Sequence, residues 1–200
     1  MTKTAAAERD AAGELLALSR RLDAYPGFPE AVESLRAGHG ATLDGVWGSS
    51  SALAAAALVR HAPGPLVVVL PHAGDVDEVA DDLRLFTAAR QGRFPAWNSE
   101  DAGAVARDED WAERLRLLKA LAENNAPQLV LTTIQALLQP VVSQAGLLVG
   151  SRRLSVGQEI VPDELLQWLV EQGFEGTPAV QLPGEFSSRG GILDIFPLDS

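Results

Sequence analysis

Residues 183–197 read Pro-Gly-Glu-Phe-Ser-Ser-Arg-Gly-Gly-Ile-Leu-Asp-Ile-Phe-Pro, which is two short β-prone runs around a Gly-Gly pair. The runs are Glu185–Arg189 and Ile192–Phe196. The pair Gly190-Gly191 predicts a two-residue turn, because both central positions of the favoured hairpin turn need a positive φ. A proline closes the stretch at each end, where no ladder N–H is needed. The stretch therefore predicts a β-hairpin over residues 185–196.

The turn also sets the pairing of the two strands. Arg189 then lies opposite Ile192, and the ladder runs on to Glu185 opposite Phe196. Side chains alternate between the two faces. The predicted core face carries Phe186, Ser188, Leu193 and Ile195, and the other face carries Glu185, Ser187, Arg189, Ile192, Asp194 and Phe196. That second face is either a docking face or a solvated face with Phe196 under a loop and Arg189 paired to Asp194.

The sequence of residues 184–197 closely resembles a segment shared by UvrB proteins and the transcription-repair coupling factor (Mfd) family, and it is more similar to the coupling-factor form. Weaker resemblance to the coupling factors extends over Pro65–Phe86, Phe94–Trp97 and Leu129–Leu138. The chain departs from the UvrB pattern at Ser187 and at Glu175-Gly176, where UvrB proteins tend to carry further arginines. It also stops soon after the hairpin, so we expect a fragment of a longer protein.

The resemblance implies a non-catalytic module that recruits UvrA in transcription-coupled nucleotide excision repair. In the family the hairpin belongs to the small UvrA-binding domain, and Arg189, Ile192 and Phe196 are the candidate UvrA contacts. RNA polymerase, DNA and the ATP-driven motor would involve parts of the full-length relative outside this chain. The alternative is a fragment of a UvrB-like ATP-dependent DNA helicase or translocase.

Composition limits the possible functions. The chain has 200 residues, a formal net charge of −11 and no cysteine. The charge disfavours tight non-specific binding to DNA, since affinity for phosphates comes mainly from Lys and Arg. The lack of cysteine excludes disulfides and thiolate metal sites. No signal peptide or membrane-spanning run is evident, and we expect a cytoplasmic protein.

The elements before residue 149 follow an α/β order after N-terminal helices. We expect buried strands at Gly40–Trp47, Leu66–Leu70 and Leu129–Thr132, the second covered on both faces as in parallel sheets. The order resembles the first half of a RecA-like, P-loop NTPase-like domain, here degenerate, over residues 1–148. Residues 149–200 predict a partial small α+β interaction domain, with a strand at Val156–Glu159 and a helix at Pro162–Gly173 before the hairpin.

A loop at Gly45–Ala52 stands where such a domain would bind nucleotide. The working pattern is Gly-x-x-x-x-Gly-Lys-Ser/Thr. Ser50 replaces the second glycine, Ser51 replaces the lysine that reaches the phosphates, and Ala52 replaces the hydroxyl that holds Mg²⁺. We predict a vestigial loop, no ATPase activity and no cofactor in this chain. The residues concerned are Gly45, Gly48, Ser49, Ser50, Ser51 and Ala52.

Two helices after the strand at residues 66–70 carry further predictions. Asp75 is expected to cap the first helix with Glu78 as its capping-box partner. Its acids, Asp75, Asp77, Glu78, Asp81 and Asp82, are better explained by the helix dipole and solvent than by a metal. The second helix, Asp108–Asn124, is expected to turn Trp111, Leu115, Leu118 and Leu121 inward. The histidines His39, His61 and His72 lack metal-ligand spacing and are expected at the surface.

Overall fold

The chain forms two compact α/β units in a computed structural model that describes residues 2–97 and 109–198, with side chains from residue 12 onward. The first unit comprises the residues up to Phe94 together with Ala126–Ile134, and the second comprises Pro95–Asn125 and Gln135–Ser200. The division of the chain near residue 150 stays a prediction. The predicted α/β class is confirmed, and each unit contains its own three-stranded sheet.

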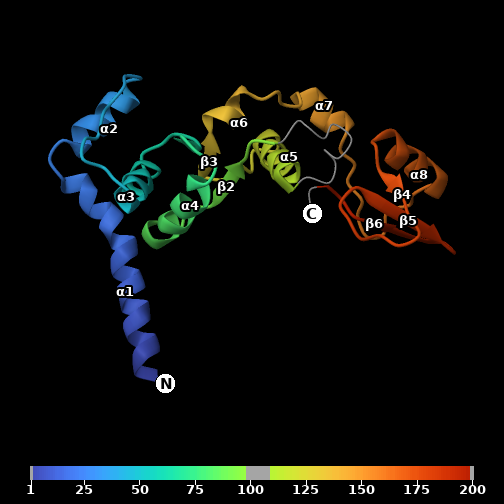
Figure 1. Cartoon of the computed structure of the whole chain (residues 1–200), viewed down its shortest axis with the longest axis horizontal. Helices are drawn as coiled ribbons and strands as arrows, with labels where there is room; N and C mark the ends of the chain where they lie inside the picture. Colours follow the sequence, from blue (N-terminus) through green and yellow to red (C-terminus); the bar gives the residue numbers. More distant parts are fainter. Residues whose placement is uncertain (1, 98–108, 199–200) are drawn as a thin grey trace. The chain divides into compact units, whose positions relative to one another are not determined.

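The first unit combines helices with a parallel sheet whose central strand is the last in sequence (Figure 1). Its strands lie in the order β1-β3-β2, so β3 pairs with both neighbours. The helices are α1 (Thr2–Arg21), a 3-10 turn at Leu22–Ala24, α2 (Phe28–Arg36), α3 (Ser49–Leu58) and α4 (Asp75–Phe86). The strands are β1 (Leu66–Leu70), β2 (Gln91–Phe94) and β3 (Leu129–Thr133).

The core of this unit lies between the sheet and the helices α3 and α4. Small side chains on α3 let the helix approach closely, and Ala52 and Ala56 are fully buried. They pack with Leu83 and Phe86 of α4 and with the alternate leucines of β3. Val76, Val79, Leu83 and Phe86 form one apolar side of α4, and all four join this cluster.

The strand β1 is covered on only one face. Leu66 and Val68 pack against the helices, whereas Val67 and Val69 keep 50% and 47% of their surface exposed. The expectation of a strand buried on both faces is therefore wrong. The uniform apolar composition of Leu66–Leu70 hid this asymmetry, since every position is equally suited to a core. The strand β2 was missed because its mixed residues carry no strand pattern of their own, although its pairing with β3 is regular.

Two other expected strands are wrong. The residues 40–47 form turns and extended chain without any ladder, and Trp47 is 82% exposed. Gly45 and Gly48 have φ values of 73° and 51°, so the chain curls where a strand would have to be extended. The residues 156–159 are also a turn, since Gly157 has a φ of 85° and the N–H of Gln158 donates to the carbonyl of Ser155. Val156 is fully exposed.

The second unit contains the helices α5 (Glu109–Ala122), α6 (Ile134–Leu138), α7 (Gln144–Val149) and α8 (Pro162–Glu171) with a small sheet. The sheet has the strands β4 (Glu175–Gly176), β5 (Glu185–Arg189) and β6 (Ile192–Ile195) in the order β4-β5-β6. Figure 1 shows α8 lying with these strands, and Leu165 and Leu169 of this helix pack against Phe186 of β5. The predicted helix after Pro162 is confirmed with an end two residues earlier.

The inward face of α5 differs from the prediction because it includes an arginine. Leu121 is 42% exposed, whereas Leu117 and Arg114 are 6% and 1% exposed. The guanidinium of Arg114 donates to the carbonyls of Pro95 at 2.8 Å, Ala136 at 3.3 Å and Pro140 at 3.3 Å. Burial lowers the pKa of Arg114 from its ordinary value. This residue ties α5 to the chain on both sides of it, which periodicity cannot reveal because arginine counts as polar.

Candidate partner-binding hairpin

The predicted hairpin is present with the predicted register. Phe186, Ser187, Ser188 and Arg189 pair with Ile195, Asp194, Leu193 and Ile192, in that order. Beyond the ladder, the N–H of Phe196 donates to the carbonyl of Glu185 at 2.9 Å. Both turn glycines have positive φ, 54° at Gly190 and 86° at Gly191. Valine or leucine would be strained at either position, so the Gly-Gly pair sets the register of the whole hairpin.

The inner face of the hairpin packs on α8 as expected, but with one exception. Phe186 is buried, and Leu193 and Ile195 are partly buried against the cluster around Leu165 and Leu169. Ser188 lies on the expected face, since it pairs with Leu193 one pair from the turn, but it is exposed rather than buried.

The outer face is divided into a covered half and an exposed half. Glu185 and Ser187 were expected to face solvent, but they are 7% and 6% exposed. The carboxylate of Glu185 accepts hydrogen bonds from the N–H groups of Gln181 at 2.8 Å and Leu182 at 3.0 Å. These bonds hold the loop between β4 and β5 over this half of the strand. Strand alternation alone cannot predict such a cover, since it depends on where the loop returns.

The exposed half lies at the turn and carries the candidate contact residues Arg189 and Ile192. Arg189 is exposed, and Ile192 keeps 67% of its surface accessible. They are cross-strand partners on one face, so the structure brings them together. The predicted alternative of an Arg189–Asp194 ion pair is absent from the described part of the chain. A guanidinium, an aliphatic side chain and the carboxylate of Asp194 therefore face solvent together.

Phe196 lies at the other end of this face. Four residues of strand separate it from Ile192, a span of about 13 Å at the usual rise per residue. It is half-buried, and its carbonyl accepts from the N–H of Gly184 at 2.9 Å. The three candidate residues thus do not form one cluster. Arg189 and Ile192 define an exposed hairpin tip, which we call the tip patch together with Asp194, and Phe196 lies beside the covered half.

The candidate nucleotide loop now has a defined geometry. Gly48 precedes the first turn of α3, and Ser49, Ser50 and Ser51 are exposed at its start, whereas Ala52 is fully buried. The hydroxyl of Ser50 accepts from the N–H of Trp47 and donates to the carbonyl of the same residue, both at 2.7 Å. The loop therefore binds back on itself, and no strand leads into it.

The other candidate polar groups are engaged locally. Asp77 of α4 pairs with Arg93 at 2.7 Å, and Asp81 pairs with Arg84. Asp75 is the first residue of α4 rather than its cap, because Gly74 precedes it and makes no side-chain cap, so the predicted capping box is wrong. No group of three metal-ligand side chains occurs within residues 12–97 and 109–198. His61 is half-buried rather than at the surface, and its Nε2 lies 2.8 Å from Asp23.

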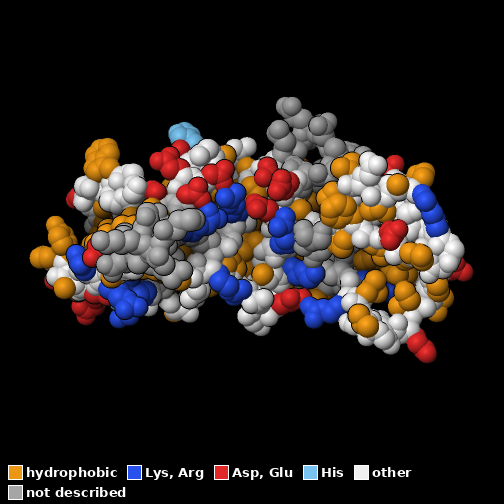
Figure 2. Space-filling view, turned by 90° about the horizontal axis from the view of Figure 1, so that it is seen from below, with side chains coloured by type: hydrophobic (Ala, Val, Ile, Leu, Met, Phe, Trp, Pro, Cys, Tyr) orange, Lys and Arg blue, Asp and Glu red, His pale blue; other side chains and the backbone are white. Residues whose placement is uncertain are grey.

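Charged side chains of both signs lie on one face of the molecule. Figure 2 shows basic and acidic side chains interspersed on the face that it presents, with hydrophobic side chains between them. No helix in the described residues is both long and apolar enough to cross a membrane.

The second unit contains a recognisable interaction domain. Residues 153–200, which include α8 and the hairpin, match the family model of the UvrB interaction domain. This match defines the class of the C-terminal region as a domain of the UvrB interaction type. The match agrees with the family resemblance of the hairpin sequence at residues 184–197.

Comparison of most of the chain with known proteins identifies full-length relatives. The chain is 34% identical over 162 residues to the transcription-repair-coupling factor of Bacillus subtilis. The matched region is 79% of this chain and 14% of that protein. The chain is 34% identical over 155 residues to the transcription-repair-coupling factor of Mycobacterium tuberculosis, covering 74% and 12%. Against the Myxococcus xanthus factor the identity is 31% over 183 residues, covering 84% and 15%. The chain is thus a homologue of part of the transcription-repair-coupling factors, and it spans only about 12–15% of the length of these relatives.

Proposed function

We propose that this chain is a non-catalytic docking module that recruits UvrA in transcription-coupled nucleotide excision repair. The observation that carries the proposal is the tip patch, where Arg189 stands exposed and without an ion pair among the described residues, beside the exposed Ile192. Arginine is enriched among the few residues that dominate the binding free energy of protein interfaces. The match of residues 153–200 to the UvrB interaction domain and the coupling-factor relatives support the same partner.

The rigid support of the patch favours docking over mere solvent exposure. The Gly-Gly turn sets the strand pairing, α8 packs under the inner face, and Glu185 fastens the loop over the covered half. A patch held in this way loses little conformational entropy when a partner binds. Acidic groups on UvrA are the expected counterparts of Arg189, and its apolar neighbour is expected to exclude water from that contact.

We also propose that the first unit is a degenerate RecA-like domain whose loop at Gly45–Ala52 binds no nucleotide. Three features support this proposal. The lysine and hydroxyl of a working loop are replaced by Ser51 and Ala52. Ala52 is fully buried and so offers nothing to a phosphate or to Mg²⁺. The hydroxyl of Ser50 accepts a hydrogen bond from the N–H of Trp47, so this N–H is not available to bind an anion. The alternative of an ATP-dependent helicase has no comparable support.

The test of docking is the binding of UvrA to the Arg189→Ala variant. Loss of an interface arginine anchor costs about 2 kcal/mol, so the dissociation constant should rise about 30-fold. The melting temperature should stay within a few degrees, because an exposed arginine without a partner contributes little to stability. Arg153→Ala is the matched control, since Arg153 lies within the same matched region but pairs with Glu123 at 3.2 Å.

Two results would contradict the proposal. Arg189→Ala and Arg153→Ala could bind UvrA equally well, which would place docking away from the tip patch. Alternatively, the unaltered chain could show no binding of UvrA at all, although it is folded by circular dichroism. Surface-immobilised UvrA with the chain as analyte separates these cases, because it reports affinity and the amount of active protein in one titration.

A further inference from the structure

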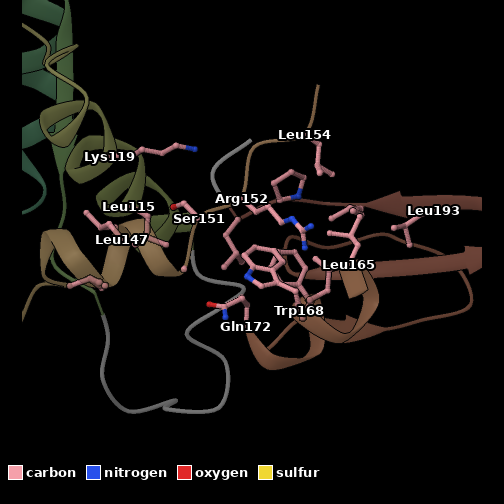
Figure 3. Close-up of a pocket in the computed structure, with 18 residues that line it drawn as sticks. Leu115, Lys119, Leu147, Ser151, Arg152, Leu154, Leu165, Trp168, Gln172 and Leu193 are labelled. Carbon is pink, nitrogen blue, oxygen red and sulfur yellow. The ribbon is translucent and has the colours of Figure 1, made fainter. Parts of the chain in front are cut away.

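A cavity of about 660 Å³ lies within the second unit (Figure 3). Ligand cavities in proteins commonly enclose about 300–1,000 Å³. Residues of α5 and α7 line one side, where Figure 3 shows Leu115 and Leu147. Residues of α8 and the hairpin line the other side, among them Leu165, Trp168 and Leu193. The walls are therefore largely aliphatic and aromatic.

One positive charge among these walls, that of Arg152, has no partner within residues 12–97 and 109–198. The side chain of Arg152 lines the cavity and projects into it in Figure 3. Within the part of the chain that the structure describes, this side chain makes no hydrogen bond and no ion pair. The neighbouring Arg153 does not line the cavity and pairs with Glu123 at 3.2 Å.

Further polar groups line the cavity near this charge. Ser151 and Gln172 provide a hydroxyl and an amide, and Lys119 of α5 provides a second cation. Among the residues that the structure describes, no acidic side chain lines the cavity. The combination of apolar walls, hydrogen-bonding groups and only positive charge is complementary to a molecule with an apolar body and one negative group.

We propose that this cavity binds a small amphipathic anion, a compound with an aliphatic body and one carboxylate. The body is buried against Leu115, Leu165 and Trp168, where removal of apolar surface from water provides most of the binding free energy. The carboxylate pairs with the guanidinium of Arg152. This site is separate in chemistry and residues from the tip patch, which holds Arg189, Ile192 and Asp194, so it does not depend on the docking of UvrA.

Decanoate is the probe, measured by titration calorimetry on the whole 200-residue chain and kept below its micelle-forming concentration. We expect saturable binding with a dissociation constant of about 10–100 μM. Decanol has the same body without the charge, and it should bind about tenfold more weakly. Arg152→Ala should raise the dissociation constant for decanoate about tenfold and leave that for decanol unchanged. Arg153→Ala should change neither by more than about twofold.

A second pair of variants tests the location. Leu154 lines the cavity and is 43% exposed, so Leu154→Glu should introduce a repelling carboxylate without damaging the core. Val156 is fully exposed and lies outside the lining, so Val156→Glu is the matched control. Leu154→Glu should abolish decanoate binding, and Val156→Glu should retain it.

Three results would overturn the proposal. Decanoate could show no saturable binding, it could bind the Arg152→Ala variant as tightly as the unaltered chain, or both glutamate variants could bind it equally. Far-ultraviolet circular dichroism of each variant establishes that it is folded. The exposed positions of Arg152, Leu154 and Val156 make loss of the fold an unexpected outcome.

Discussion

Replacement of Arg114 by alanine should destabilise the second unit more than any substitution of an exposed arginine. Arg114 is 1% exposed and donates to three backbone carbonyls that belong to different segments, at Pro95, Ala136 and Pro140. Removal of the guanidinium leaves these carbonyls without that donor and opens space beside α5. The segments on either side of the helix then lose a shared attachment.

The expected loss follows from the three hydrogen bonds. A hydrogen bond from a charged donor contributes about 1.5–3 kcal/mol. The bond to Pro95 at 2.8 Å has good length, whereas the other two are long at 3.3 Å and contribute less. Desolvation of the guanidinium, which also lowers its pKa, offsets part of this gain. We therefore expect Arg114→Ala to lower the free energy of unfolding by about 3–4 kcal/mol.

Urea unfolding followed by tryptophan fluorescence measures this loss. Trp97 and Trp111 lie in the second unit in an edge-to-face contact, with ring centroids 5.5 Å apart, so two of the chain's four tryptophans report the segment that Arg114 holds. Arg116→Ala is the control on the same helix, since Arg116 is exposed, and it should change stability by less than about 0.5 kcal/mol. Arg114→Lys should fall between the two, because one ammonium cannot reach three carbonyls. If Arg114→Ala and Arg116→Ala unfold at the same urea concentration, the buried guanidinium is not a structural attachment.

Three further predictions concern the turn, the acid stability and the nucleotide loop. Gly191→Val should cost about 1–2 kcal/mol in thermal unfolding because Gly191 has a φ of 86°, whereas Gly64→Val, at an unstrained open position, should cost much less. The hydrogen bond from His61, aided by Arg60, holds the pKa of Asp23 below its ordinary value. The charged carboxylate therefore stabilises the fold above about pH 4, and this contribution disappears as the pH falls through the lowered pKa. Asp23→Asn should thus be less stable than the unaltered chain by at most about 1 kcal/mol near neutral pH, given that Asp23 is 42% exposed, and urea titrations should show the two converging in acid. Mg-ATP should bind no tighter than about millimolar in titration calorimetry, and micromolar binding would contradict the proposed loss of the nucleotide site.

The parts of the fold that local sequence controls were predictable. The Gly-Gly pair determined the hairpin and its register, and the spacing of Leu165 and Leu169 determined the buried side of α8. Both depend on residues close in sequence, so periodicity and turn chemistry suffice. The tip patch also followed from the register, since cross-strand partners share a face.

The parts that depend on how a loop or a remote segment folds back were not predictable. Glu185 is buried because the loop just before it turns back and donates the N–H groups of Gln181 and Leu182 to its carboxylate. Arg114 is buried because the carbonyls of Pro95, Ala136 and Pro140, from segments remote in sequence, surround its guanidinium. Both residues are charged, and charged residues are almost never fully buried without partners, so composition argues against the correct answer. The expected strand at Gly40–Trp47 does not form, because Gly45 has a φ of 73° and the chain turns where a strand would have to be extended.

The order of the first sheet has a consequence for synthesis on the ribosome. β3 is the central strand and the last of the three to be made, and the register pairs Leu66 and Gln91 with the same residue, Leu129. Neither β1 nor β2 has a strand partner until β3 has left the exit tunnel. During that interval the apolar strand Leu66–Leu70 has unpaired backbone groups and is exposed to aggregation. The nascent chain should therefore depend on chaperones until residue 133 emerges, whereas the β5–β6 hairpin can pair as soon as it is made.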